Sequence, residues 1–151
     1  IATGARLIKG MGKYTIAHWS RRDVESKMPV ASGSDTQFYW YGDNSWRYTH
    51  GGVGGEYYYP KSVSIPAGTW GYYVATYDGS NVKIYRNGVY EGAKATTGVA
   101  NWAQGIKIGG WTSSPSYAYD GKIDAVQFYD RALSDQEIKQ NFEAHRARYG
   151  I

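Results

Sequence analysis

The stretch YDGSNVKIYRNGVYEG, residues 77–92, carries a turn signal on each side of a short alternating run. Apolar and polar side chains alternate from Asn81 to Arg86, as in a strand with one face against a core. Asp78-Gly79 and Asn87-Gly88 are pairs that tolerate a positive φ, and Asn-Gly is a strong signal for a two-residue hairpin. The stretch therefore predicts a strand over 81–86 that turns back onto a second strand over Val89 to Gly92.

Similar runs, each bounded by Gly, Pro, Ser or Asn, recur along most of the chain. They are Ala5–Lys9, Lys13–Ser20, Thr36–Tyr41, Trp46–His50, Glu56–Ile65, Trp70–Tyr77, Val89–Lys94, Gly105–Ile108 and Lys122–Tyr129. Short strands at this spacing predict an all-β fold, an antiparallel β-sandwich or jelly roll. The 151 residues fit a single domain over 1–151, with a core large enough to fold without disulfides.

One segment departs from the strand pattern, and it lies at the C-terminal end. Ser134 and Glu137 have the spacing of a capping box, in which each side chain satisfies a free backbone amide of the first helical turn. Ile138 and Phe142 then form an apolar stripe at helical spacing. The sequence predicts a short C-terminal helix over about 134–147.

The last predicted strand contains an irregularity. Val126 and Phe128 alternate correctly for one buried face, but Ile123 is out of phase with both. An extra residue in one strand of an antiparallel pair produces such a phase change. We therefore expect a β-bulge near Asp124-Ala125.

The composition restricts the classes of function. Sixteen Tyr and six Trp accompany only three Phe, so most aromatic rings carry a polar group suited to wet interfaces and sugar contacts. Tyr also packs well on half-exposed sheet faces, which is the plainer interpretation of any single one. The net charge of +4 is modest and dispersed, which disfavours nucleic acid as a partner. No apolar run approaches the roughly 18 residues of a membrane span.

Three segments resemble the laminin-G-like branch of the concanavalin A-like jelly rolls. They are AGTWGYYVATYDGSNVKIYRNGVYEG (Ala67–Gly92), IKIGG (Ile106–Gly110) and YDGKIDAVQFYDRALSDQEIKQNF (Tyr119–Phe142). The segment KYTIAHWSRR (Lys13–Arg22) is similar to an earlier strand of this family, which carries a Trp near its end. The resemblance implies two stacked antiparallel sheets with variable loops at one rim, and it implies no particular activity.

The final segment, ALSDQEIKQNFEAHRARYGI (Ala132–Ile151), resembles versions of this domain that close bacteriophage structural proteins. This resemblance implies a non-enzymatic virion component, a decoration or tail-associated domain on the virion surface, with capsid or tail subunits as partners. Such proteins often form symmetric clusters, so a homo-oligomer or an assembly-bound protomer is expected. The start at Ile1, without Met or a signal-like segment, is typical of the C-terminal part of a longer chain.

The alternative is a carbohydrate-binding module for host or environmental glycans. Aromatic rings stack on the apolar C–H faces of sugars, and several Trp and Tyr occur in segments rich in loops. The candidate ligand-binding residues are Trp46, Tyr48, Trp111, Tyr117 and Tyr119.

The sequence contains no convincing catalytic residues. A glycosidase needs two carboxylates facing one cleft, and the Glu-x-Asp-x-Glu pattern of jelly-roll glycosidases does not occur. Asp124 and Asp130 are the nearest substitute, but both flank hydrophobic positions and are more typical of strand-end or turn acceptors. No nucleophile elbow is present. We expect the chain not to be an enzyme.

We predict neither a metal site nor a cofactor. There is no Cys, and the three His are too far apart in sequence for zinc spacing. Asp35, Asp43 and Asp78 lie in turn contexts that could supply oxygen ligands to calcium. Each is more typical of an Asx turn, in which the side chain bonds the backbone two residues on.

Overall fold

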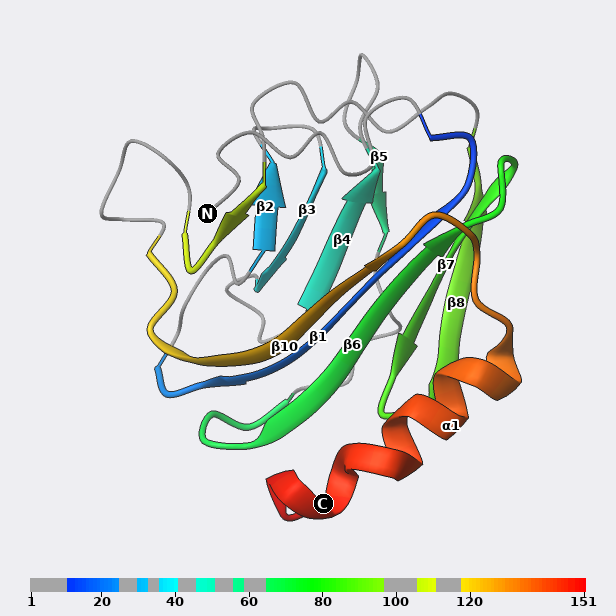
Figure 1. Cartoon of the computed structure of the whole chain (residues 1–151). Helices are drawn as coiled ribbons and strands as arrows, with labels where there is room; N and C mark the ends of the chain where they lie inside the picture. The colour runs from blue at the N-terminus through cyan, green and yellow to red at the C-terminus, as the bar shows by residue number, and fades with distance from the viewer. Residues whose placement is uncertain are drawn as a thin grey trace.

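The computed structural model describes residues 11–24, 30–32, 36–40, 46–50, 56–58, 65–96, 106–110 and 118–151. These residues form two stacked five-stranded sheets, A and B, with a short helix at the C-terminal end (Figure 1). Every strand pairing within the two sheets is antiparallel. The predicted all-β sandwich is confirmed.

The strands are distributed between the sheets as follows. Sheet A has the order β10 (Gly121–Tyr129), β1 (Tyr14–Arg22), β6 (Trp70–Tyr77), β7 (Asn81–Arg86) and β8 (Val89–Ala95). Sheet B has the order β5 (Glu56–Tyr58), β4 (Trp46–His50), β3 (Thr36–Trp40), β2 (Val30–Ser32) and β9 (Lys107–Ile108).

The hairpin predicted at Asn87-Gly88 is present and joins β7 to β8. Both turn residues have a positive φ, 52° at Asn87 and 76° at Gly88. This is the combination that matches the twist of the flanking strands in a two-residue hairpin. The Asn87 side chain also fastens the turn to β6, because its Oδ1 accepts a hydrogen bond of 2.9 Å from the backbone N–H of Tyr72.

The space between the two sheets holds the first of two hydrophobic cores. Val82 and Ile84 enter it, as their alternation predicts. Sheet A also contributes Tyr14, Ile16, Tyr73, Ala75 and Tyr77, and sheet B contributes Phe38, Trp46 and Tyr48. Burial of this apolar area is the main force that holds the layers together.

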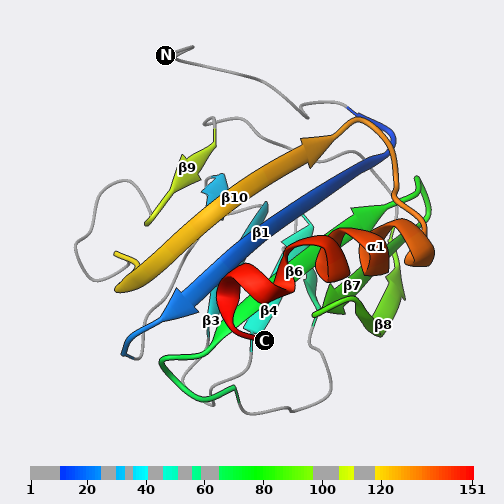
Figure 2. The ribbon, with the colours of Figure 1, turned by 60° about the horizontal axis from the view of Figure 1, so that its bottom comes forward.

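The second core lies on the outer face of sheet A, under the helix α1 (Asp135–His145) and the 3₁₀ turn η2 (Arg146–Tyr149). Figure 2 shows α1 in front of β6 and β7. Trp19 of β1 is at its centre, with Phe142 stacked on it at a ring distance of 5.8 Å and Tyr149 at 4.0 Å. The predicted helix over 134–147 is therefore present, although its last turn tightens into a 3₁₀ turn.

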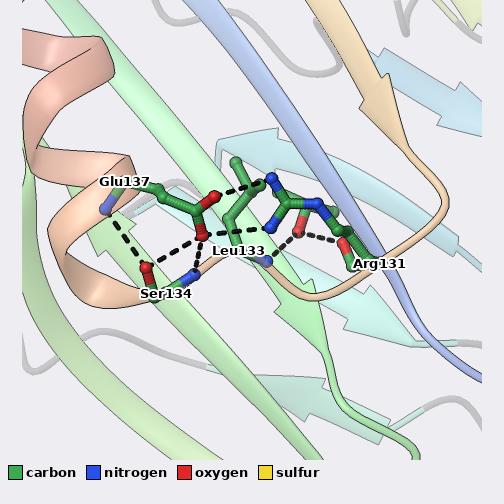
Figure 3. A network of polar contacts seen from close by, with 5 residues as sticks. Arg131, Leu133, Ser134 and Glu137 are labelled. Carbon is green, nitrogen blue, oxygen red and sulfur yellow. Dashed lines mark hydrogen bonds and ion pairs between the residues drawn. The ribbon is translucent and has the colours of Figure 1, made fainter.

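A polar network fixes the start of α1 (Figure 3). The Glu137 carboxylate accepts hydrogen bonds from the Ser134 backbone N–H at 2.8 Å and from the Arg131 guanidinium at 2.6 and 3.0 Å. The Ser134 hydroxyl accepts in turn from the backbone N–H of Glu137. The hydrogen bond with Arg131 is the largest cause that lowers the pKa of Glu137 to about 2. The capping box is confirmed.

The expected bulge in β10 is also confirmed. Trp19 pairs with Asp124, whereas Ala17 pairs with Gln127, so β10 contains one residue more than β1 over this interval. Ala125 has a φ of 48°, which accommodates the extra residue. The bulge restores the phase, and Val126 and Phe128 both pack against the inter-sheet core.

Some strand bounds differ from the prediction. The short strand β2 was not predicted, since Val30–Ser32 contains too few residues to show a period. The run Glu56–Ile65 is described as a strand only over Glu56–Tyr58, and Gly105–Ile108 only over Lys107–Ile108. The run Ala5–Lys9 lies outside the described residues.

Candidate functional site

Two of the five predicted ligand-binding aromatics lie in the core. Trp46 is 3% exposed and Tyr48 is fully buried, both on β4 and directed at sheet A. The Trp46 Nε1–H donates to Glu91 at 3.1 Å, and the Tyr48 hydroxyl lies 2.7 Å from that of Tyr14. A ring that stacks on a sugar needs an exposed face, so the prediction for these two residues is corrected: they tie the two sheets together.

The structure describes only one of the other three candidates, Tyr119. Tyr119 is half-buried just before β10 and packs against the inter-sheet core, and its backbone N–H donates to Gly109 at 3.0 Å. Trp111 and Tyr117 lie outside the described residues, so their role in ligand binding stays a prediction.

The outer face of sheet A is occupied by the chain's own C-terminal segment. Tyr149 stacks on Trp19 and also contacts Trp70, at a ring distance of 4.9 Å. Its hydroxyl donates to Asp124 at 3.1 Å, and Arg148 forms an ion pair with the same carboxylate at 2.9 Å. Asp124 thus anchors the C-terminal turn, which agrees with the prediction of a structural role.

Asp78, one of the residues considered as a calcium ligand, stabilises a turn in the structure. Its Oδ1 accepts hydrogen bonds from the backbone N–H groups of Ser80 at 2.8 Å and Asn81 at 2.7 Å, which is an Asx turn. Burial opposes ionisation, but these hydrogen bonds outweigh it and lower the pKa of Asp78. The described parts of the chain contain no group of three His, Asp or Glu that could hold a metal ion. Asp35 and Asp43 lie outside them.

The outer face of sheet B carries different side chains, which are described on β4, the second strand of that sheet. Because strand residues alternate, the positions between core-facing Trp46, Tyr48 and His50 belong to the opposite face. These positions are Arg47 and Thr49, which are only 8% and 1% exposed. A cation and a hydroxyl therefore lie side by side on a sheet face and are nearly shielded from water.

The strand register extends this face on both sides of β4. Arg47 pairs with Tyr39, and Thr49 pairs with Gln37 on one side and with Tyr57 on the other. Register partners in antiparallel strands share a face. We call this set of positions the Arg47–Thr49 face: Ala31, Gln37, Tyr39, Arg47, Thr49, Tyr57 and Lys107.

Two observations make this face a candidate binding site. Among the residues that the structure describes, none forms a hydrogen bond with the buried Thr49 hydroxyl, and a buried polar atom is normally hydrogen-bonded. In addition, both described helices, α1 and η2, pack on sheet A rather than here (Figure 2). Among the described residues the face is thus polar, includes two Tyr positions and has no helix packed on it, although Arg47 and Thr49 themselves are buried within the protein.

Sequence reasoning missed this face although the signal was present. It selected Trp46 and Tyr48 by residue type, since aromatic rings are good platforms for sugars. In WRYTH (Trp46–His50), however, the aromatic residues alternate with Arg47 and Thr49. In a two-layer sandwich the larger apolar set faces the core, which leaves the polar set on the outer face.

Comparison with known proteins places the chain in a family. Residues 1–139 match the sequence profile of the Concanavalin A-like lectin/glucanases superfamily, and the chain belongs to this superfamily. No curated protein matches the sequence. No helix in the described part of the chain is long and apolar enough to cross a membrane.

Several solved structures share the fold at low sequence identity. The CBM40 domain of the Ruminococcus gnavus IT-sialidase has a TM-score of 0.75 at 14% identity, over 93% of this chain and 88% of that chain. The same domain has been solved bound to alpha2,3 sialyllactose, with a TM-score of 0.71 at 13% identity, over 86% of this chain and 82% of that chain.

Two further structures are similar over a smaller part of their own length. Domain 4 of AbnA, a GH43 extracellular arabinanase from Geobacillus stearothermophilus solved with arabinotriose, has a TM-score of 0.65 at 18% identity, over 85% of this chain and 66% of that chain. A Bacteroides ovatus protein described as carbohydrate-binding has a TM-score of 0.72 at 16% identity, over 86% of this chain. This chain spans 40% of the length of the Bacteroides ovatus chain. These structures are described as carbohydrate-binding or were solved with a bound saccharide.

Proposed function

We propose that this chain is a non-catalytic carbohydrate-binding domain whose ligand lies on the Arg47–Thr49 face. The observation that carries the proposal is the outer face of sheet B, whose register positions are mostly polar and on which no described helix packs.

The residue types on this face suit a sugar. Arg and Gln donate hydrogen bonds, and Thr both donates and accepts, which matches the mixed donor and acceptor character of sugar hydroxyls. Two register positions, Tyr39 and Tyr57, are of the type that stacks on the C–H face of a pyranose ring. The named ligands of the structural neighbours, sialyllactose and arabinotriose, support the same class of ligand.

Binding without cleavage is the activity that this face favours. Glycosidases of both stereochemical types use a pair of carboxylic acids about 5–10 Å apart. None of the seven positions of the face is Asp or Glu. We therefore expect a bound saccharide to remain intact.

The proposal is tested by screening the purified chain on a glycan array and then measuring the affinity for the best ligand by calorimetry. We expect Lys107→Ala to weaken binding about tenfold while the melting temperature changes little, because Lys107 is a half-buried member of the face whose ammonium group can donate hydrogen bonds to sugar hydroxyls. Lys122→Ala is the matched control, since Lys122 is exposed on β10 in sheet A. Failure to bind any glycan, or equal binding by the Lys107→Ala variant, would refute the proposal.

The virion role stays a prediction. It was inferred from the C-terminal segment, and the structure gives that segment a role within the domain, because α1 and η2 cover Trp19 and its neighbours. The predicted capsid or tail partners, the place on the virion surface and the homo-oligomer are equally untested. We therefore place carbohydrate binding first.

A further inference from the structure

We infer that Asn87, in the turn between β7 and β8, is a site of spontaneous chemical modification: it loses its side-chain amide by reaction with the backbone nitrogen of Gly88, and the folded domain slows this reaction. The inference goes beyond the proposed function, because it concerns the other sheet and involves no ligand. It is carried by the Asn87-Gly88 pair and by the hydrogen bonds that hold Asn87 against β6.

Asn87 continues the pairing of β7 with β6 although its backbone has left the strand. The last pair of the ladder between these strands is Tyr73 with Arg86, and Asn87 follows with a φ of 52°. Its backbone N–H donates to the Tyr72 carbonyl at 2.8 Å, and its side-chain Oδ1 accepts from the Tyr72 backbone N–H at 2.9 Å. A hydrogen-bonded pair in an antiparallel ladder exchanges two such bonds. The side-chain carbonyl of Asn87 therefore takes the place of its own backbone carbonyl.

The same side chain is followed by Gly88, whose backbone nitrogen is not shielded by a side chain of its own. When base removes the proton of this N–H, the nitrogen can attack Cγ of Asn87. A bond forms between the nitrogen and Cγ, the bond from Cγ to Nδ2 breaks, and ammonia leaves a cyclic imide. Water then opens the imide, giving aspartate if the new bond is cleaved and isoaspartate if the original peptide bond is cleaved.

The contacts of the turn oppose the first step of this reaction. The attack requires the Asn87 side chain to rotate toward Gly88, whereas the hydrogen bond from Tyr72 holds Oδ1 against β6. Tyr72 is fully buried, so breaking this bond leaves a buried N–H without its partner, which costs free energy. Gly88 itself is packed against α1, since a Cβ placed there would lie 3.2 Å from Phe142 and 3.3 Å from the Cα of Lys139. We expect the reaction to wait until the turn opens.

The two products should affect the fold differently. Aspartate keeps an oxygen acceptor on a side chain of the same length, so the hydrogen bond from Tyr72 is retained. Isoaspartate carries the main chain through the former side chain, which lengthens the turn by one carbon and removes the carbonyl that accepts from Tyr72. A two-residue hairpin depends on backbone angles that match the twist of its strands. Isoaspartate at position 87 should therefore loosen the hairpin from β6 and α1.

The first experiment measures the rate of modification in the intact chain. The chain is incubated at mildly alkaline pH, with and without guanidinium chloride, and its peptides are mapped by mass spectrometry over time. In denaturant Asn87 should react faster than Asn81 and Asn141, because these precede the larger residues Val82 and Phe142. In the folded chain the reaction at Asn87 should be at least about tenfold slower than in denaturant, as expected for a step that requires local opening. Equal rates at Asn87 in the two conditions, or no product there in denaturant, would overturn the inference.

The second experiment separates the two products. After incubation the isoaspartate form is isolated by chromatography and compared with the variant Asn87→Asp, which carries only the aspartate product. Asn87→Asp should keep a melting temperature close to that of the original chain and slow hydrogen exchange at the Tyr72 amide. The isoaspartate form should melt at a lower temperature and exchange this hydrogen faster. The same melting temperature and exchange rate for both forms would show that the side chain of Asn87 does not hold the turn, and would contradict the inference.

Discussion

At the scale of single residues, His18 is the most unusual side chain in the inter-sheet core. It is fully buried on β1, with its ring 4.7 Å from that of Phe38 in an edge-on contact and 5.5 Å from that of Tyr73. Neither ring nitrogen has a hydrogen-bond partner among the described residues. Burial lowers the pKa of His18 to about 3, so the imidazole is neutral at pH 7.

His18 should therefore make the stability of the domain depend on pH. Its pKa in the folded state is below the ordinary value of 6.5, so between pH 6.5 and about 3 the unfolded chain binds a proton that the folded chain does not. The free energy of unfolding should fall as the pH is lowered through this range, by up to about 1.4 kcal/mol per pH unit. Chemical denaturation from pH 7.5 to 4 measures this slope.

The variant His18→Leu isolates the contribution of this residue. Replacing a buried, unpaired polar group by an apolar one of similar size is often neutral or stabilising at neutral pH, and the variant should show a shallower slope below pH 6.5. His145→Gln on the exposed side of α1 is the control and should keep the slope of the original chain. Identical slopes for His18→Leu and the original chain would contradict the assignment.

Residue type alone was a poor guide to the candidate site. Trp46 and Tyr48 look like ligand platforms in the sequence, yet they are buried because the face of β4 that meets sheet A is decided by its larger apolar set. Arg47 and Thr49 look ordinary in the sequence. They stand out only because they are buried on the opposite face of β4. The burial of a residue depends on contacts with residues that are distant in the chain, which the local sequence does not show.

At the scale of elements, the strongest local signals were the most reliable. The hairpin at Asn87-Gly88, the capping box at Ser134 and the bulge near Ala125 are each determined by residues within a few positions of one another. The short strand β2 was missed, because only its pairing with β3 and β9 defines it. Sequence reasoning therefore predicted the local pieces and the layered class, but not the order of the strands in each sheet.

The β7–β8 hairpin gives a test at this scale, and the change is Gly88→Ala. A side chain at a φ of 76° is strained by about 1–2 kcal/mol. In addition, its Cβ would lie 3.2 Å from Phe142 and 3.3 Å from the Cα of Lys139 on α1. We expect a loss of at least about 1 kcal/mol in the free energy of unfolding, measured by urea denaturation.

Gly92→Ala is the matched control for this prediction. Gly92 lies on β8 of the same hairpin, and a Cβ added there would meet nothing within 4 Å. Its substitution should be neutral or slightly stabilising, because Ala restricts the unfolded chain more than Gly does. Equal losses for both variants would mean that α1 does not pack closely against the turn.

At the scale of the whole molecule, the two outer faces of the sandwich have different roles. The outer face of sheet A is covered by the chain's own C-terminal segment, which buries Trp19 and is anchored by Asp124. The outer face of sheet B has no described helix and carries Arg47 and Thr49. A single layered fold thus separates a stabilising face from a proposed binding face.

The edges of sheet A also bear on how copies of the chain would associate. β10 contains the bulge at Ala125, and β8 has an irregular register with β7 next to Tyr85. Bulges twist an edge strand and hinder pairing with another chain. The predicted homo-oligomer, if it forms, should use side-chain contacts rather than a sheet that continues across two copies.

The central claim is that the ligand binds on the Arg47–Thr49 face, and the most direct test is an NMR titration of the ¹⁵N-labelled chain with the best glycan. The account predicts that the backbone amide signals of Arg47 and Thr49 shift with ligand concentration, while those of Ile138 and Phe142, in α1 on the other side of the sandwich, stay in place. Shifts confined to α1 and the C-terminal turn, with none on β4, would contradict it.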